Sequence, residues 1–463
     1  MTEQLKLKLN DSKATRWGAL VIVAFTMMAA YYVNDVVAPL KTMLETDLAW
    51  SSTDFGFFTG GYSFLNVFFL MLIWGGLILD RFGIRFTGKL ATILMVGGTA
   101  LEYYAMTGLA GADATLFGIN EIFGYKTGVF VAFAGYSIFG VGAEVAGITV
   151  SKIIATWFKG KELATAMGVQ VALARIGSQA GYAVAIPLAR AFGISTPVLL
   201  GLVLLLGGMI AFFIFAVMDK KLDKQMEAAA IAAGTEDEEE KFSFKDVKNI
   251  LVNPGFWLIA LLCVLFYSCV FPFQKFASEL MIIKYGINEN VAGTFAGLPA
   301  LGALILTPVF GGFIDKRGKS ASIMLLGSAM LICVHFIYAI PDINYWLVAI
   351  VLMIILGIAF SLVPSAMWPA VAKIFPVSQL GTAYALIFFI QNIGLWGIPT
   401  LIGWVLDAYC ISGKKPDGTN MYDYTVPMCI FTGIACLSLI VALLLKKADK
   451  KYGYKLEEPN IQK

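Results

Sequence analysis

The strongest constraint in this sequence is a series of long apolar stretches separated by short polar ones. A run of about 20 apolar residues is long enough to cross the hydrocarbon layer of a membrane as a helix. Twelve stretches qualify, and they cover residues 17–40, 53–79, 86–110, 128–156, 162–189, 194–217, 254–283, 289–314, 321–340, 345–373, 379–407 and 426–446. The sequence therefore predicts an all-α membrane protein with twelve transmembrane helices.

The composition supports this prediction and excludes several function classes. The chain has 463 residues, of which 59% are hydrophobic and only 14% are charged, whereas soluble domains are about 25% charged. The net charge is +3 without a basic, aromatic-rich patch, so nucleic acid is not an expected partner. We find no nucleophile–base pair, nucleotide loop or metal cluster, so neither an enzyme nor a cofactor or metal site is expected.

The distribution of basic residues predicts the orientation. Loops on the cytoplasmic side carry an excess of Lys and Arg. If the N-terminus is cytoplasmic, its side of the membrane holds about 25 of the 34 Lys and Arg. The opposite side then holds Lys41, Lys126, Arg190, Lys284, Lys414 and Lys415. Both termini are therefore predicted to be cytoplasmic.

The sequence also predicts two halves. A long polar stretch separates the sixth and seventh spans, and its acidic run 236–240 is interpreted as part of a solvated linker, with a partner site as the alternative. The segments ELATAMGVQVALARIG (162–177) and QLGTAYALIFFIQNIG (379–394) align without gaps and share five of sixteen residues. The predicted domains are a six-helix bundle at 1–218, a cytoplasmic linker at 219–252, a second six-helix bundle at 253–446 and a cytoplasmic tail at 447–463.

A loop motif occurs once in each half. GLILDRFGIR follows the second span, and a degenerate copy, GGFIDKRGKS, follows the eighth. Such a loop can act as a conformational switch, because its acid and bases can pair with charges on neighbouring helices while its second glycine permits a tight turn. The alternative is a simple basic cytoplasmic loop. The residues assigned to this role are Gly76, Asp80, Arg81, Gly83, Arg85, Asp315, Lys316 and Gly318.

This motif, at this position in a 6+6 chain, resembles the signature loop of the major facilitator superfamily. The resemblance covers the chain from the first span to the twelfth and implies two six-helix bundles that work by alternating access. Position 84 is Ile where the family usually has a basic residue. GKELATAMGVQVALARIGS and SAMWPAVAKIFPVSQLGTAYALIFFIQNIG look like the branch of major facilitator superfamily domain-containing protein 1, which contains the lysosomal dipeptide transporter.

Two opposite charges are predicted at one depth in the membrane. Arg175 lies thirteen residues beyond Glu162 in the fifth span, and Glu144 lies fourteen residues before the end of the fourth. Each is roughly 20 Å deep at 1.5 Å per residue, where an unpaired charge is costly. Either they form a structural ion pair, or they clamp a zwitterion, Arg175 binding its carboxylate and Glu144 its ammonium. The branch resemblance implies that this acid and arginine bind the peptide ends.

Four further residues are candidate substrate contacts. Asn392 occupies the repeat position of Arg175, and Gln391 precedes it; plain interhelical bonds are the alternative for both. Trp368 lies between two prolines in the tenth span and is expected to form a pocket wall or to contact an amine, with packing alone as the alternative. Asp35 is a candidate gate or ammonium contact, or a polar helix end.

Three other ionisable residues lie within spans. Lys275 is expected to pair with Glu279 four residues later on the same helix. Glu102 is a candidate proton carrier, and His335 is interpreted as a packing residue.

Together these features predict a transporter of dipeptides or similar small zwitterions, which the resemblance implies to be a uniporter. The alternatives are a carrier of organic anions, a proton-coupled nutrient transporter and a non-transporting receptor on the same fold. The expected partners are the small-molecule substrate, the lipid bilayer and, if the protein is eukaryotic, an accessory membrane subunit. The outer loops have no Asn-x-Ser/Thr site, which fits a bacterial inner membrane better than a lysosomal one.

Overall fold

The computed structural model describes residues 9–111, 114–158, 161–233 and 244–459. Within them the chain forms long helices and two short hairpins. The long helices are α1 (Lys13–Val36), α3 (Ser52–Phe68), α4 (Met71–Thr107), α5 (Thr127–Trp157), α6 (Leu163–Phe192), α7 (Thr196–Ala233), α9 (Pro254–Tyr285), α11 (Leu298–Arg317), α12 (Ser320–Ala339), α13 (Trp346–Ile374), α14 (Val377–Tyr409) and α15 (Thr425–Tyr452). The short elements are η1 (Leu9–Asp11), η2 (Ala38–Leu40), α2 (Lys41–Asp47), α8 (Phe244–Val252), α10 (Glu289–Ala296), β1 (Glu121–Ile122), β2 (Tyr125–Lys126), β3 (Ile411–Lys414) and β4 (Asn420–Tyr422).

The helices confirm the predicted all-α membrane fold. Among the described residues, nine helical segments are long and apolar enough to cross a membrane, and the bent pair α3–α4 makes up to ten. The break between α3 and α4 bends the chain by 58°, and Leu70 at the break has a φ of 54°. The predicted eighth span is likewise divided into α10 and α11. The helix α6, which carries Arg175, is not among these nine segments, although it corresponds to the predicted span 162–189.

Gly83 divides α4 into the end of the second span and the whole third span. Its φ of 73° and ψ of 175° interrupt an otherwise continuous helix. This backbone conformation is open to glycine and strained for residues with a Cβ, so the turn predicted at this position is present. The backbone break at Gly83 thus separates the end of the second span from the third span, in agreement with the two predicted segments on either side of it.

The loop of the first half is held by charges from its own half. The Nζ of Lys152 on α5 lies 3.3 Å from Asp80, and Arg85 contacts Asp223 at 2.9 Å and Asp219 at 3.5 Å, both on α7. The guanidinium of Arg81 lies over the Phe82 ring. These contacts join the loop to α5 and α7.

The second copy of the loop, after α11, contacts the C-terminal segment that follows α15. Gly318 also has a positive φ, of 70°, and the backbone N–H of Lys319 donates to the carbonyl of Glu457. Asp315 is half-buried and Lys316 is exposed near the end of α11. The tail therefore packs beside this loop.

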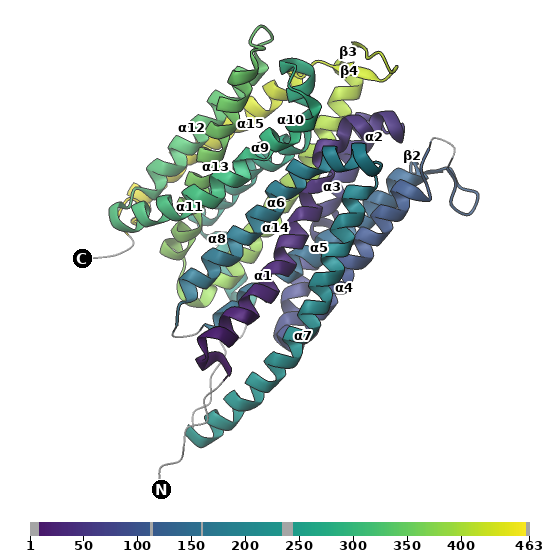
Figure 1. The fold of residues 1–463 in the computed structure, drawn as a ribbon. Coiled ribbons are helices and arrows are strands. Elements are labelled where there is room, and N and C mark those ends of the chain that lie inside the picture. Colours follow the sequence, from purple (N-terminus) through teal and green to yellow (C-terminus); the bar gives the residue numbers. More distant parts are fainter. Residues whose placement is uncertain (1–8, 112–113, 159–160, 234–243, 460–463) are drawn as a thin grey trace.

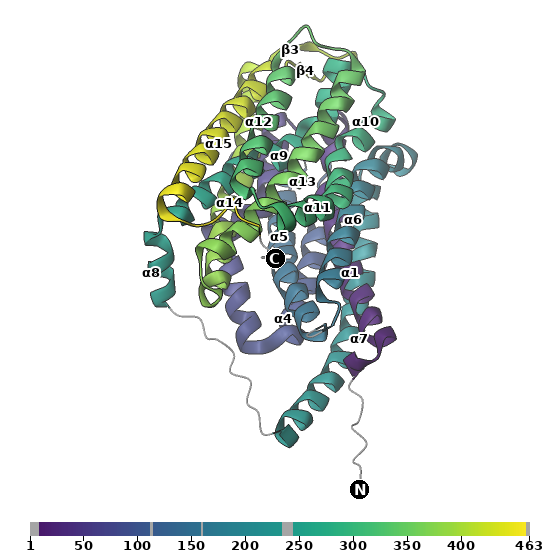
Figure 2. The same ribbon diagram turned by 90° about the vertical axis from the view of Figure 1, so that its left-hand side faces the viewer.

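The two halves lie side by side (Figure 1), and ion pairs and hydrogen bonds join them at one end. The β3–β4 hairpin lies at this end, which we call the hairpin end, and α15 begins beside it. The opposite end, where α1 begins and α15 ends, is the terminal end (Figure 2). At the hairpin end α3 of the first half crosses α14 of the second at Gly56 and Gly403, where an added Cβ on Gly403 would stand 2.9 Å from the Gly56 Cα.

The connection between the halves is partly helical. The helix α7 continues to Ala233, so it extends into the predicted linker 219–252, and α8 occupies the end of that range. The acidic run 236–240 lies outside the described residues.

At the terminal end of the first half, an ion pair joins α1 to the start of α6. Arg16 donates to both carboxylate oxygens of Glu162, at 2.9–3.1 Å. A guanidinium and a carboxylate in this arrangement form charge-assisted hydrogen bonds. These bonds lower the pKa of the Glu162 carboxyl below its ordinary value.

We expect Glu162→Gln to lower the melting temperature of the purified protein at neutral pH. A carboxyl with a lowered folded-state pKa contributes stability above its unfolded pKa and loses it as pH falls through the folded value. The difference between wild type and Glu162→Gln should therefore shrink when melting is measured under acidic conditions. An equal difference at neutral and acidic pH would contradict the ionic role of Glu162.

Candidate functional site

Arg175 lies between the two halves, against aromatic rings from both of them. Its Cζ is 5.6 Å from the ring centroid of Tyr31 on α1 and 5.0 Å from that of Phe360 on α13. Both distances are within the range of a cation–π interaction. The side chain is half-buried, and within the described residues it forms no ion pair. A guanidinium in this position has all its hydrogen-bond donors available for an anionic group.

Glu144 is the opposite charge in this region, and it does not pair with Arg175. Its Oε1 accepts a hydrogen bond of 3.0 Å from the hydroxyl of Tyr62 on α3. Like Arg175 it is half-buried, and Tyr31 lies within electrostatic range of both. The structural ion pair between Arg175 and Glu144, one of the two alternatives drawn from the sequence, does not form in the described structure. The carboxylate and the guanidinium are instead presented separately.

An aromatic cluster in the second half extends from Arg175 to Trp368. The Phe360 ring packs against Phe271 at 5.3 Å, and Tyr267 contacts Phe271 at 5.5 Å and Trp368 at 6.5 Å. Trp368 is half-buried and also stacks on Phe388 of α14, with ring centroids 4.8 Å apart. The candidate pocket residue Trp368 is therefore linked to Arg175 through ring contacts.

The two amides of α14 are more deeply buried. Gln391 is 6% exposed and Asn392 only 2%. The Nδ2 of Asn392 donates to the carbonyl of Phe388 one turn earlier, while its Oδ1 is buried without a hydrogen-bond partner in the described residues. Burying an amide oxygen without a hydrogen-bond partner costs free energy. The Asn392 Oδ1 can therefore still accept a hydrogen bond.

Asp35 joins the two halves. Its carboxylate lies 3.1 Å from the Nζ of Lys275 on α9 and accepts hydrogen bonds from Asn34 and from Ser178 on α6. Lys275 also donates to the Asn34 carbonyl at 2.6 Å. The predicted pairing of Lys275 with Glu279 is wrong, because contacts between the halves compete with local spacing along a helix.

Glu279 belongs instead to a buried charge network at the hairpin end. The Nζ of Lys41 on α2 contacts Glu45 of its own helix and lies 2.5 Å from Glu279 of the other half. Lys415 of the second half lies 3.4 Å from Glu45 and 3.5 Å from Glu279. Lys41, Glu45 and Glu279 are each at most 5% exposed, so their charges compensate one another away from water.

A second contact at this end caps a helix across the interface. Asp407 on α14 accepts hydrogen bonds from the backbone N–H groups of Ser52 and Thr53, at 3.3 and 2.6 Å. These are among the first amides of α3, which have no partner within their own helix. Tyr422 of the hairpin also donates to Asp407, at 2.7 Å. The structure is therefore in a state closed at the hairpin end.

Two further candidates, Glu102 and His335, are deeply buried, and Glu102 lies within electrostatic range of Lys275. Glu102 is fully buried on α4, and both of its carboxyl oxygens lack a hydrogen-bond partner among the described residues. His335 is fully buried and packs against the rings of Phe273 and Phe431, as its interpretation as a packing residue requires.

The sequence reasoning missed Tyr31, Tyr62 and Phe360. These residues surround the two charges, but each is one aromatic residue among 18 Tyr and 35 Phe. For Tyr31 one signal was available, since it lies one helical turn before Asp35 on the first span. Nothing in the sequence marks Tyr62 or Phe360.

The fold and its interior charges define a multi-pass membrane protein of the transporter type. Residues 20–399 and 276–458 match the family model described as Major Facilitator Superfamily. The chain belongs to the major facilitator superfamily, and it is a membrane transporter and not an enzyme.

Curated relatives and solved structures agree with this family. The chain is similar to the lysosomal dipeptide transporter MFSD1 of Homo sapiens, with 29% identity over 454 residues, 95% of this chain and 88% of the human protein. The protein of the same name from Danio rerio is 26% identical over 441 residues, 93% of this chain and 86% of its own length.

The solved structures show the same fold at low identity. A mutant of the nucleoside transporter NupG has a TM-score of 0.69 at 12% identity and covers 92% of this chain and 98% of its own. The peptide transporter POT in complex with sulfate has a TM-score of 0.66 at 15% identity, with 95% of each chain covered.

Proposed function

We propose that this protein transports dipeptides or similar small zwitterions by alternating access, as a uniporter. The observation that carries the proposal is the half-buried guanidinium of Arg175 between the two halves, which forms no ion pair with any residue that the structure describes. The similarity to the proteins named lysosomal dipeptide transporter supports the cargo class.

The proposed site recognises both ends of the substrate. Arg175 binds the carboxylate with its planar fork of donors. Glu144, oriented by Tyr62, accepts from the ammonium. The charges of these two residues lie on the first half, whereas the second half contributes the aromatic cluster around Trp368 and the buried amides Gln391 and Asn392. Peptide side chains then contact mainly aromatic surface, which discriminates weakly between apolar side chains.

The proposed cycle uses the charges at the hairpin end. In the state described above, Asp35–Lys275 and the Lys41 network close that end. Opening it separates Asp35 from Lys275 and admits substrate from that side. We propose that the terminal end faces the cytoplasm, as the distribution of Lys and Arg predicts, in a bacterial inner membrane or alternatively in a lysosomal one.

A ligand panel tests the cargo assignment. A ligand that binds the folded state raises its apparent melting temperature by mass action. Purified protein should be stabilised by many dipeptides, and blocking either the amino or the carboxyl end of the peptide should remove the effect. Stabilisation by small anions alone would replace the dipeptide assignment with an anion carrier that uses Arg175.

Glu144→Gln should weaken the binding of free-amine dipeptides by about 10- to 100-fold, since a hydrogen bond to a charged group contributes roughly 1.5–3 kcal/mol. Binding of the matching N-acetylated peptides, measured by the same melting titration, should change little. Tyr62→Phe serves as a milder comparison, because it removes the group that orients Glu144 and leaves its charge. Equal losses for free and acetylated peptides would assign Glu144 a structural role.

A further inference from the structure

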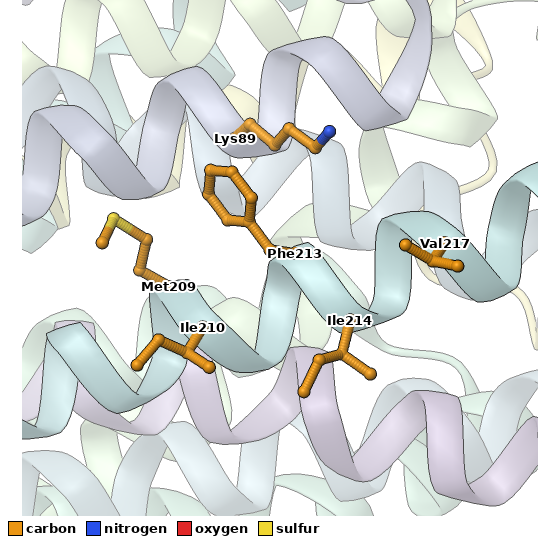
Figure 3. Close-up of a pocket in the computed structure, with 6 residues that line it drawn as sticks. All are labelled: Lys89, Met209, Ile210, Phe213, Ile214 and Val217. Carbon is orange, nitrogen blue, oxygen red and sulfur yellow. The ribbon is translucent and has the colours of Figure 1, made fainter.

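A groove on the lipid-facing surface of the first half combines apolar side chains with one lysine. It lies between α4 and α7, has a volume of about 520 Å³, and is lined by Lys89, Met209, Ile210, Phe213, Ile214 and Val217. Figure 3 shows the Lys89 side chain on one helix above the Phe213 ring of the other. The Nζ of Lys89 lies 5.2 Å from the centroid of that ring.

The groove faces lipid along most of its length. Ile210, Ile214 and Val217 are 55–60% exposed, and they recur every three or four residues along α7, so they form one stripe on its surface. On a transmembrane helix an exposed apolar stripe contacts the acyl chains. A hydrocarbon chain can therefore lie along this stripe.

The charged end of the groove lies at the border of the membrane. Beyond Val217, α7 changes from apolar residues to the charged sequence that begins at Asp219. On α4, Lys89 is one turn after Arg85, which is paired with Asp219 and Asp223. Both acids near the groove are thus engaged by Arg85, and Lys89 forms no ion pair within the described part of the chain. Its ammonium lies over Phe213, six residues before that charged sequence begins, and its flexible stem can extend toward the headgroups.

We propose that this groove binds an anionic glycerophospholipid, with the headgroup phosphate on Lys89 and one acyl chain along Ile210, Ile214 and Val217. A basic residue near an anionic membrane surface attracts anionic headgroups, and among the described residues no acid pairs with Lys89. The bound lipid fills the seam where α4 and α7 pack, next to the contact between Gly88 and the Phe212 ring. The lipid therefore stabilises the packing of α4 against α7, in addition to the ion pairs of Arg85 that join these helices.

The test is lipid binding to detergent-purified, delipidated full-length protein. Phosphatidylglycerol should raise the melting temperature more than phosphatidylcholine does, and native mass spectrometry should show its preferential retention. Lys89→Gln should weaken the apparent affinity for phosphatidylglycerol about fivefold. Lys89→Arg, which keeps the charge, and Lys447→Gln, which removes an exposed lysine near the end of α15, should both retain it.

Each outcome decides the proposal. Unchanged preference for phosphatidylglycerol in Lys89→Gln would overturn it, and so would equal binding of both lipids by the wild type. Glycerol phosphate without acyl chains should stabilise the protein much less than the lipid; equal stabilisation would mean that the groove takes a free phosphate. If Lys89→Gln does not fold, the comparison of the two lipids on Lys89→Arg and wild type still decides the outcome. Dipeptide binding should be retained in Lys89→Gln.

Discussion

Arg175→Ala should reduce dipeptide transport by about a hundredfold or more while the protein still folds. Truncating one partner of a buried charged contact costs roughly 2–5 kcal/mol in binding. The substitution removes the only fixed positive charge that the account assigns to the peptide carboxylate. Because Arg175 forms no ion pair in this part of the structure, its loss leaves no carboxylate of the protein unpaired, so the effect on folding should be small.

The measurement is uptake of a labelled dipeptide into proteoliposomes, with melting temperature as the control for folding. Arg175→Lys is the matched variant, since it keeps the charge and loses the planar fork that binds a carboxylate bidentately. It should retain partial transport. Wild-type rates in Arg175→Ala would remove Arg175 from the site, whereas loss of folding in both variants would assign the guanidinium to packing between Tyr31 and Phe360.

Lys41→Ala should shift the protein away from the state closed at the hairpin end. Removing one partner of a buried ion pair costs about 3–5 kcal/mol, because the remaining charge is left without compensation. Here Glu45 and Glu279 would face each other with only the more distant Lys415 between them. A shift of this size is enough to change the dominant conformation of a two-state protein.

The distance between spin labels at Thr46→Cys and Tyr409→Cys reports this change, since both residues are exposed and lie on opposite halves at the hairpin end. The native cysteines are replaced in this background. The distance distribution should move to longer values in Lys41→Ala and return part of the way in the double variant Lys41→Ala/Glu279→Gln, which removes the excess negative charge. An unchanged distribution in Lys41→Ala would mean that the network does not hold the halves together.

Much of the fold follows from the sequence, because membrane spans depend on local composition. The predicted stretch 128–156 corresponds to α5 and the predicted stretch 162–189 to α6, each within three residues at either end. The breaks inside α3–α4 and α10–α11 were not predicted, since an interrupted apolar stretch has the same composition as a continuous one. The turn at Gly83 was predicted, because glycine and the loop motif mark it.

The candidate site was only partly accessible from sequence. Helical rise gives the depth of Arg175 and Glu144, but it does not give their partners. Tyr62 is 82 residues from Glu144, and Lys275 is 240 residues from Asp35. Contacts over such separations depend on how the two halves pack, and the local spacing of Lys275 and Glu279 pointed to the wrong pair. Structure supplied these contacts and the aromatic surroundings of Arg175.

Counterflow measures directly whether the protein carries dipeptides through the site between its two halves. Proteoliposomes containing the purified protein are loaded with an unlabelled dipeptide, and the entry of the same labelled dipeptide is followed with and without a pH gradient. A dipeptide uniporter should show saturable accumulation of label that needs no gradient and that fails in Arg175→Ala. Absence of counterflow with any dipeptide would contradict the assignment, and accumulation only with a proton gradient would replace uniport with proton coupling.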